Sequence, residues 1–125
     1  MADHHDVRRI ALTLPEAVAA DDGMSVSVPN GGRHKKFAWV WLERTDPKQA
    51  RVPRTDVVAV RVAGQEEKEA LLASDPAKFF TEPHYNGFPA VLVRLKAVAE
   101  DELRELLVGA WRCQAPRALV RDSGL

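Results

Sequence analysis

The stretch MSVSVPNGGRHKKFAWVWLE (residues 24–43) decides the fold that we expect for this chain. Its first five residues alternate apolar and polar side chains, which predicts a β-strand with one wet face. Asn30, Gly31 and Gly32 follow, and these residue types tolerate the positive φ angles of a tight turn. Residues 35–43 then predict a second strand that returns along the first.

Both faces of this second strand are apolar. A two-residue period places Phe37, Trp39 and Trp41 on one face, and Ala38, Val40 and Leu42 on the other. Such a strand is expected in the middle of a sheet or covered on both sides. The two tryptophans are candidates for stacking on nucleic-acid bases, but the period that they share with Phe37 favours a place in the core.

The remaining segments supply helices and two further strands. Strands are predicted at residues 57–62 and 90–95. Helices are predicted at residues 3–14, 65–73, 76–80, 99–111 and 116–120. Consecutive strands joined by short connections pair antiparallel, and such a sheet can pack helices on one side. The sequence therefore predicts an α+β fold: a single antiparallel sheet of about four or five strands, with helices packed on one face.

Two of the predicted helices have clear apolar faces at helical spacing. The first presents Val7, Ile10, Ala11 and Leu14, and its end is expected before Pro15. The second presents Leu103, Leu106, Leu107, Ala110 and Trp111. Between the strands, residues 44–56 and 81–89 are rich in polar residues and helix breakers, so both are expected to be loops.

Length and composition indicate one globular domain spanning residues 1–125. Apolar residues make up 46% and charged residues 29%, as in ordinary folded proteins. The single Cys113 permits no intrachain disulfide, and we expect it to be a small buried residue rather than a reactive thiol. The start of the chain is too polar for a signal peptide, and no apolar run approaches about 20 residues. These features favour a cytoplasmic protein without a membrane partner.

The net charge is zero, but the charge is unevenly placed. Residues 31–61 carry eight basic and three acidic side chains, a local net charge of +5. A polyanion such as DNA is expected to meet this segment first. The candidate nucleic-acid-binding residues are those of the turn region and of the following loop: Arg33, His34, Lys35, Lys36, Lys48, Arg51 and Arg54.

Other readings of the same residues remain open. The two glycines before Lys36 do not make a nucleotide-binding P-loop, because Phe37 and a strand follow instead of Ser or Thr and a helix. A solvated basic turn without a ligand is the simplest alternative. His84 and Tyr85 suggest either a small-molecule pocket or a turn histidine beside a packed tyrosine. No catalytic residues, metal site or cofactor are expected.

Several segments together resemble the YjbR/MmcQ-like family of small bacterial proteins. The similarity lies in the order and spacing of residues 35–38 (KKFA), 83–85 (PHY), 90–95, 102–111 and 115–120. It implies an α+β fold and a DNA-binding, non-enzymatic role. In this chain Arg33 and His34 stand between Gly32 and Lys35, where many relatives have a Gly-Lys-Lys-Phe-like turn, so the tip of the hairpin differs.

A second function class is a protein-interaction module that uses an exposed sheet face or edge. Dimers, and loss of association after apolar rather than basic surface changes, would distinguish it from DNA binding. The residues leave the oligomeric state and any DNA sequence preference open.

Overall fold

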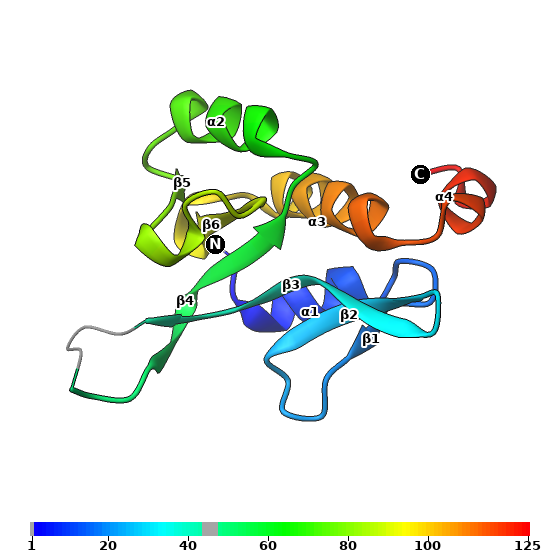
Figure 1. Ribbon diagram of the computed structural model, residues 1–125, viewed down its shortest axis with the longest axis horizontal. Helices are drawn as coiled ribbons and strands as arrows, with labels where there is room; N and C mark the ends of the chain where they lie inside the picture. Colours follow the sequence, from blue (N-terminus) through cyan, green and yellow to red (C-terminus); the bar gives the residue numbers. More distant parts are fainter. Residues whose placement is uncertain (1, 44–47) are drawn as a thin grey trace.

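The computed structural model describes residues 2–43 and 48–125. Figure 1 shows one sheet with helices packed against it. The strands are β1 (Val18–Ala19), β2 (Ser25–Asn30), β3 (Arg33–Glu43), β4 (Val52–Arg61), β5 (Phe79–Phe80) and β6 (Ala90–Arg94). The helices are α1 (His4–Ala11), α2 (Gln65–Ser74), α3 (Glu100–Gln114) and α4 (Arg117–Ser123), with 3-10 turns η1 (Pro83–Tyr85) and η2 (Leu95–Ala97).

The six strands lie in the order β1-β2-β3-β4-β6-β5, and every neighbouring pair is antiparallel. The α+β class and the single antiparallel sheet are therefore confirmed. The sheet has two more strands than the four predicted segments because both edge strands, β1 and β5, are only two residues long. Strands of that length are too short to show a periodic pattern, and short edges offer little unpaired backbone to other chains.

The hairpin of β2 and β3 closes through Gly31 and Gly32, which have φ angles of 62° and 81°. Asn30 and Arg33 face each other across this two-residue turn. Glycine suits both positions because side chains strain the backbone there. β3 begins two residues earlier than predicted, so Arg33 and His34, expected in the turn, lie on the strand with Lys35 and Lys36.

Two predicted segments need correction. The predicted loop 44–56 is shorter than expected, because β4 begins at Val52 and pairs with the end of β3; residues 44–47 lie outside the described residues. Pro53 is tolerated there because β6 pairs only with Val57 to Arg61, which leaves this part of β4 at a sheet edge. The predicted helix 76–80 is wrong: Phe79 and Phe80 form β5 and place their side chains in two different cores.

All four α-helices contribute to one large core on one face of the sheet. The predicted apolar face of α1 is confirmed, since Val7, Ile10, Ala11 and Leu14 are buried. α1 ends at Ala11, one turn before Pro15. In α3 the predicted stripe is buried except for Leu106, which is half-buried. In the described part of the chain, no helix has the length and apolar character needed to cross a membrane.

A second, smaller core lies on the opposite face of the sheet. Trp41, Val57, Ala59 and Leu92 are buried in it, and Trp39, Phe80 and Tyr85 pack around them. Residues 79–89 therefore cover part of this face. The central, two-sided character predicted for β3 is confirmed, because it is the third of six strands and contributes to both cores.

The prediction that Phe37 shares a face with the two tryptophans is wrong. Phe37 lies in the helix-side core, whereas Trp39 and Trp41 lie on the other side. The pairing of β2 and β3 shifts between Val26 and Ser27, so that Phe37 is an extra residue on β3. A β-bulge of this kind breaks the strict two-residue alternation.

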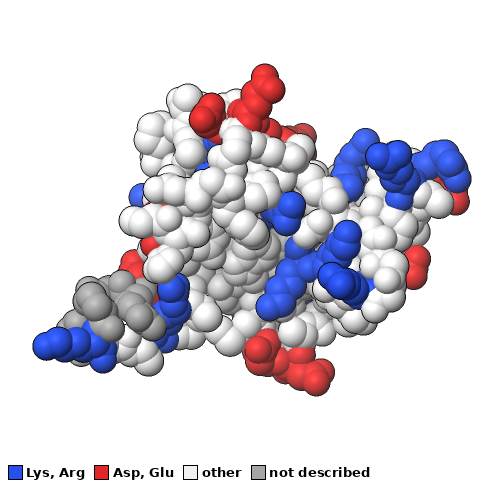
Figure 2. Space-filling model, in the orientation of Figure 1, with Lys and Arg blue, Asp and Glu red and all other residues white. Residues whose placement is uncertain are grey.

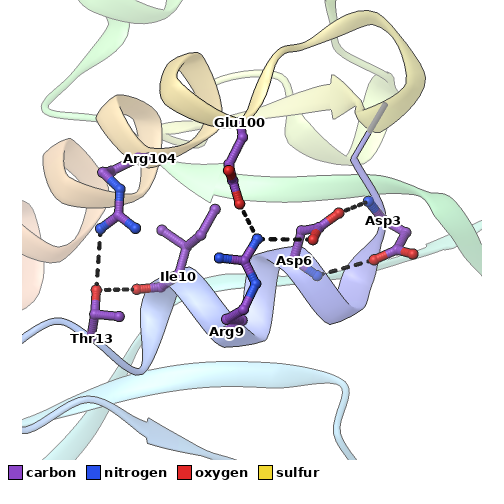
Figure 3. A network of polar contacts seen from close by, with 7 residues as sticks. All are labelled: Asp3, Asp6, Arg9, Ile10, Thr13, Glu100 and Arg104. Carbon is purple, nitrogen blue, oxygen red and sulfur yellow. Dashed lines mark hydrogen bonds and ion pairs between the residues drawn. The ribbon is translucent and has the colours of Figure 1, made fainter.

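Figure 3 shows how α1 is capped and tied to α3. The backbone N–H of Asp3 donates to the Asp6 carboxylate, and the N–H of Asp6 donates to the Asp3 carboxylate, both at 3.0 Å. Arg9 bridges Asp6 and Glu100, the first residue of α3. The Arg9 guanidinium holds the pKa of the Asp6 carboxyl below its ordinary value of 3.8.

We expect Asp3→Ala to lower the free energy of unfolding by about 1 kcal/mol, because the helix then loses its capping acceptor. Urea denaturation followed by circular dichroism measures the change. Asp3→Asn keeps a side-chain oxygen at the cap and should behave nearly as wild type. Equal stability of the alanine variant and the wild type would contradict the capping role.

Candidate nucleic-acid interface

Arg33, His34, Lys35 and Lys36, which begin β3, are exposed and divide between the two faces of the sheet. Lys35 is paired with Val28, which belongs to the helix-side core, so Lys35 lies toward that side. His34 and Lys36, paired with Pro29 and Ser27, lie toward the opposite face.

The candidates Lys48, Arg51 and Arg54 lie at the other end of β3. This strand has 11 residues, and at about 3.3 Å per residue its ends are separated by roughly 33 Å. Figure 1 shows the β2–β3 turn and the start of β4 at opposite sides of the molecule. The structure thus places Arg33, His34, Lys35 and Lys36 at one end of β3, on both faces of the sheet, and the other three candidates at the opposite end.

Two of these distant candidates are engaged by neighbouring side chains. Arg54 forms ion pairs with Glu43 at 2.7 Å and with Asp56 at 3.3 Å. The hydrogen bond to Glu43 is the main cause of the raised pKa of Arg54. Arg51 lies 3.0 Å from Nε2 of His84 and donates to the Leu42 carbonyl at 3.3 Å. Arg54 therefore offers little net charge to a polyanion.

An open concavity of about 420 Å³ lies beside Lys36, on the sheet face opposite the large core. None of its lining residues is acidic; they are His34, Lys36, Trp39, Arg61, Phe88 and Gln114. Arg61 reaches it from the end of β4, where Val57 and Ala59 share its side of the strand. Cations from two neighbouring strands are thus gathered around aromatic rings.

The aromatic rings at this concavity hold one another in place. Trp39 donates its indole N–H to the Tyr85 hydroxyl at 3.0 Å. The Phe88 ring lies edge-on to both, with centroid distances of 6.2 Å in each case. The Arg61 guanidinium lies 5.6 Å from the centre of the Phe88 ring, a cation–π distance. Phe88 nevertheless remains 42% exposed, unlike the half-buried Trp39 and Tyr85.

A buried lysine of α2 anchors the loop that carries Tyr85 and Phe88. Lys68 of α2 is only 3% exposed. Its ammonium group donates to the backbone carbonyls of Tyr85 and Phe88, the latter at 2.9 Å. Burial lowers the pKa of Lys68 below its ordinary value of 10.5. Holding a cation in this position favours one fixed conformation of the loop.

The other wall of the concavity is tied to the end of α3. The Gln114 side chain donates to the Lys36 carbonyl at 2.9 Å, and Asn30 donates its side-chain N–H to the Gln114 carbonyl at 2.9 Å. These two bonds connect the β2–β3 hairpin to the helix on either side of its turn. The basic end of β3 is therefore fixed relative to the body of the protein.

Charges of the two signs occupy different parts of the surface in Figure 2. Basic side chains gather over the β2–β3 hairpin and α4, and a second group lies at the β3–β4 end. Acidic side chains gather over α2 and over the loop before β2. Among the described residues, Arg33, Lys35, Lys36 and Arg61 form no ion pair.

Sequence reasoning missed Arg61, Lys68 and Phe88 as parts of this site. Arg61 ends an otherwise apolar strand segment, which is a signal that it faces something other than the core. Phe88 stands between Gly87 and Pro89, where a large apolar side chain in a turn is unusual. Nothing in the sequence distinguishes Lys68 from the exposed charged residues around it.

The remaining candidates are placed as follows. Cys113 is exposed, so the prediction that it is buried is wrong; its position on α3 turns it away from the core stripe. Tyr85 packs against the second core, as one of the two readings of that turn predicted, and His84 is exposed. Trp41 is buried in that core, while Trp39 both packs against it and lines the concavity.

The family model described as YjbR matches residues 12–113 of this chain. The uncharacterised proteins Mb2600 of Mycobacterium bovis and Rv2570 of Mycobacterium tuberculosis are each 38% identical to it over 129 residues, covering 97% of this chain and 95% of the relative. The crystal structure of Deinococcus radiodurans protein DR2400, with a DUF419 domain, matches the fold with a TM-score of 0.67 and 22% identity, covering 100% of this chain and 90% of that one. On the extent of these matches, this chain belongs to the YjbR family.

Proposed function

We propose that this protein binds DNA in the bacterial cytoplasm through the basic end of β3, and that it acts by binding rather than as an enzyme. The observation that carries the proposal is the group of exposed cations Arg33, Lys35 and Lys36, which form no ion pair among the described residues. Cations without acidic partners are available to neutralise phosphates. His34 and Arg61 lie with Lys36 around the concavity, on the sheet face opposite Lys35.

Two further features support the proposal. The hairpin is fixed by its two-glycine turn and by the bonds to Gln114, so little ordering is needed when it meets a ligand. His84, the histidine of the alternative small-molecule pocket, lies 3.0 Å from the Arg51 guanidinium, a contact that favours a binding surface over a catalytic pair. Lys48 and Arg51 at the far end of β3 are outer contacts that only a long DNA segment would reach.

A titration of duplex DNA at two salt concentrations tests the proposal. If Arg33, Lys35 and Lys36 each neutralise one phosphate, the logarithm of the affinity falls with that of salt with a slope of about −2.7. Between 50 and 200 mM salt the affinity then falls roughly 40-fold. An affinity that does not change with salt, or no binding of either duplex or single-stranded DNA at 50 mM salt, would overturn the proposal.

The double variant Lys35→Glu with Lys36→Glu should weaken duplex binding by about tenfold or more and flatten the salt dependence. Lys96→Glu with Arg104→Glu is the matched control, because it changes the net charge equally at exposed positions away from the hairpin. Equal losses in both double variants would show that only the overall charge matters, which contradicts a local interface.

A second candidate function is the binding of a protein partner at the β3–β4 hairpin. Leu42 and Val52 remain 40% and 54% exposed there, at paired strands that protrude from the sheet. Exposed apolar side chains on a protruding hairpin are typical of interaction surfaces. Light scattering of the wild type and of Val52→Lys tests this candidate. A species larger than the monomer that forms in the wild type and is absent from the variant would support it.

A further inference from the structure

We infer that the concavity beside Lys36 holds an unpaired base of single-stranded DNA, with Phe88 as its stacking platform. This inference rests on the proposed function and names the form of DNA that the site takes. The base stacks on the exposed part of the Phe88 ring, and Lys36 and Arg61 contact the flanking phosphates.

The lining residues favour a ligand that combines a flat ring with a negatively charged group next to it. Phe88 leaves 42% of its surface to solvent although Trp39 and Tyr85 next to it are half-buried. Sequence-tolerant binding of single strands combines such exposed aromatic rings with a cationic surface that follows the backbone. Here Lys36 and Arg61 supply the cations, and no carboxylate lines the concavity.

Arg61 is suited to contact a phosphate at this position. Among the described residues it has no ion-pair partner, and its Nε atom is buried without a hydrogen-bond partner. The guanidinium carbon lies instead over the Phe88 ring, 5.6 Å from the ring centre. A guanidinium that is positioned by an aromatic ring keeps its outer N–H groups for an external acceptor.

A single strand fits this site better than a duplex does. In a duplex each base is stacked on its neighbours, so its flat face is closed to a protein side chain. The open concavity of about 420 Å³ has room for a base that lies against its wall. It also lies on the sheet face that carries Trp39, beside the β2–β3 hairpin.

Hydrogen bonds within the protein hold the residues of the concavity in place without a ligand. Lys68 fixes the two carbonyls of the loop that carries Tyr85 and Phe88. The Trp39–Tyr85 hydrogen bond sets the neighbouring rings, and Gln114 holds the Lys36 backbone. Because these groups are already ordered, binding loses little conformational entropy.

The test compares a single strand of about 15 nucleotides, long enough to span a typical site, with the duplex of the same sequence and with a free mononucleotide. The proteins are wild type, Phe88→Ala, Phe88→Leu and Lys36→Gln. We expect wild type to bind the single strand more tightly than the duplex. Phe88→Ala should weaken single-strand binding by about 5- to 150-fold and leave duplex binding within about twofold.

Two variants separate stacking from other roles of these side chains. Phe88→Leu keeps an apolar side chain but no aromatic face, so it should lose nearly as much single-strand affinity as the alanine variant. Lys36→Gln should weaken the binding of both DNA forms, because each presents phosphates. Circular dichroism should show unchanged folding, since Phe88 is an exposed loop residue.

Three results would overturn the inference. If Phe88→Ala binds the single strand as wild type does while Lys35→Glu with Lys36→Glu weakens both forms, stacking fails and the proposed function stands. If neither DNA form binds at low salt, both fail. If the mononucleotide binds at Phe88 and the strands do not, the site takes a free nucleotide and not DNA.

Discussion

Trp111→Ala should lower the free energy of unfolding by about 3–5 kcal/mol, the largest effect that we expect of any single substitution. Trp111 is fully buried in α3, within the core that the four α-helices share. Its indole N–H donates to the Pro15 carbonyl at 3.0 Å, which connects α3 to the segment after α1. Truncation leaves a large cavity and an unpartnered carbonyl. Guanidinium denaturation followed by circular dichroism measures the loss.

Trp111→Phe separates the contribution of apolar packing from that of the hydrogen bond to the Pro15 carbonyl. It retains most of the apolar contact but removes the indole N–H, so we expect a smaller loss of about 1–2 kcal/mol. Because α3 carries Gln114, the alanine variant should also loosen the bonds that fix the β2–β3 hairpin. A loss below 1 kcal/mol for Trp111→Ala would show that the core tolerates this truncation and that α3 is not its main support.

Lys68→Met should lower the free energy of unfolding by about 2–3 kcal/mol and weaken ligand binding at the concavity. Methionine fills a similar space, so the loss comes from the carbonyls of Tyr85 and Phe88, which no longer receive hydrogen bonds. The loop that they belong to then samples other conformations, and Phe88 loses its fixed position. Chemical denaturation gives the first effect, and titration with the single strand gives the second.

Glu69→Met is the control for Lys68→Met, because Glu69 is exposed on the same helix and should change stability little. If Lys68→Met is as stable as wild type, the two carbonyls are satisfied in another way and the anchoring role fails.

The stability difference between wild type and Lys68→Met should depend on pH. The pKa of Lys68 is lowered in the folded protein, so between that pKa and 10.5 the unfolded chain binds more protons than the folded one. The free energy of unfolding contributed by this group therefore rises as pH rises through that window. Other titrating groups are common to both proteins and cancel in the difference. A difference that shrinks toward pH 10.5 would contradict the burial of a charged Lys68.

The sequence predicted a basic site after a tight turn, but it did not predict which residues form that site. The basic run Arg33 to Lys36 and its position after a tight turn are visible in the sequence, because turn chemistry and charge are local properties. The division of the seven candidate nucleic-acid-binding residues into two groups was not visible. It follows from the length of β3, which begins at Arg33 and ends at Glu43 and therefore holds the two groups at its opposite ends.

The sequence by itself determined the α+β class, the Gly31–Gly32 turn and the apolar faces of α1 and α3, because each depends on neighbours within a few residues. Only the tertiary structure decided that Phe37 leaves the face of the tryptophans, that Arg61 and Phe88 meet beside Lys36, and that Lys68 anchors the loop of Phe88. Strand register and bulges arise from pairing between distant segments, and a one-residue shift moves a side chain to the other face of the sheet. The composition of the site therefore depends on contacts that no local pattern encodes.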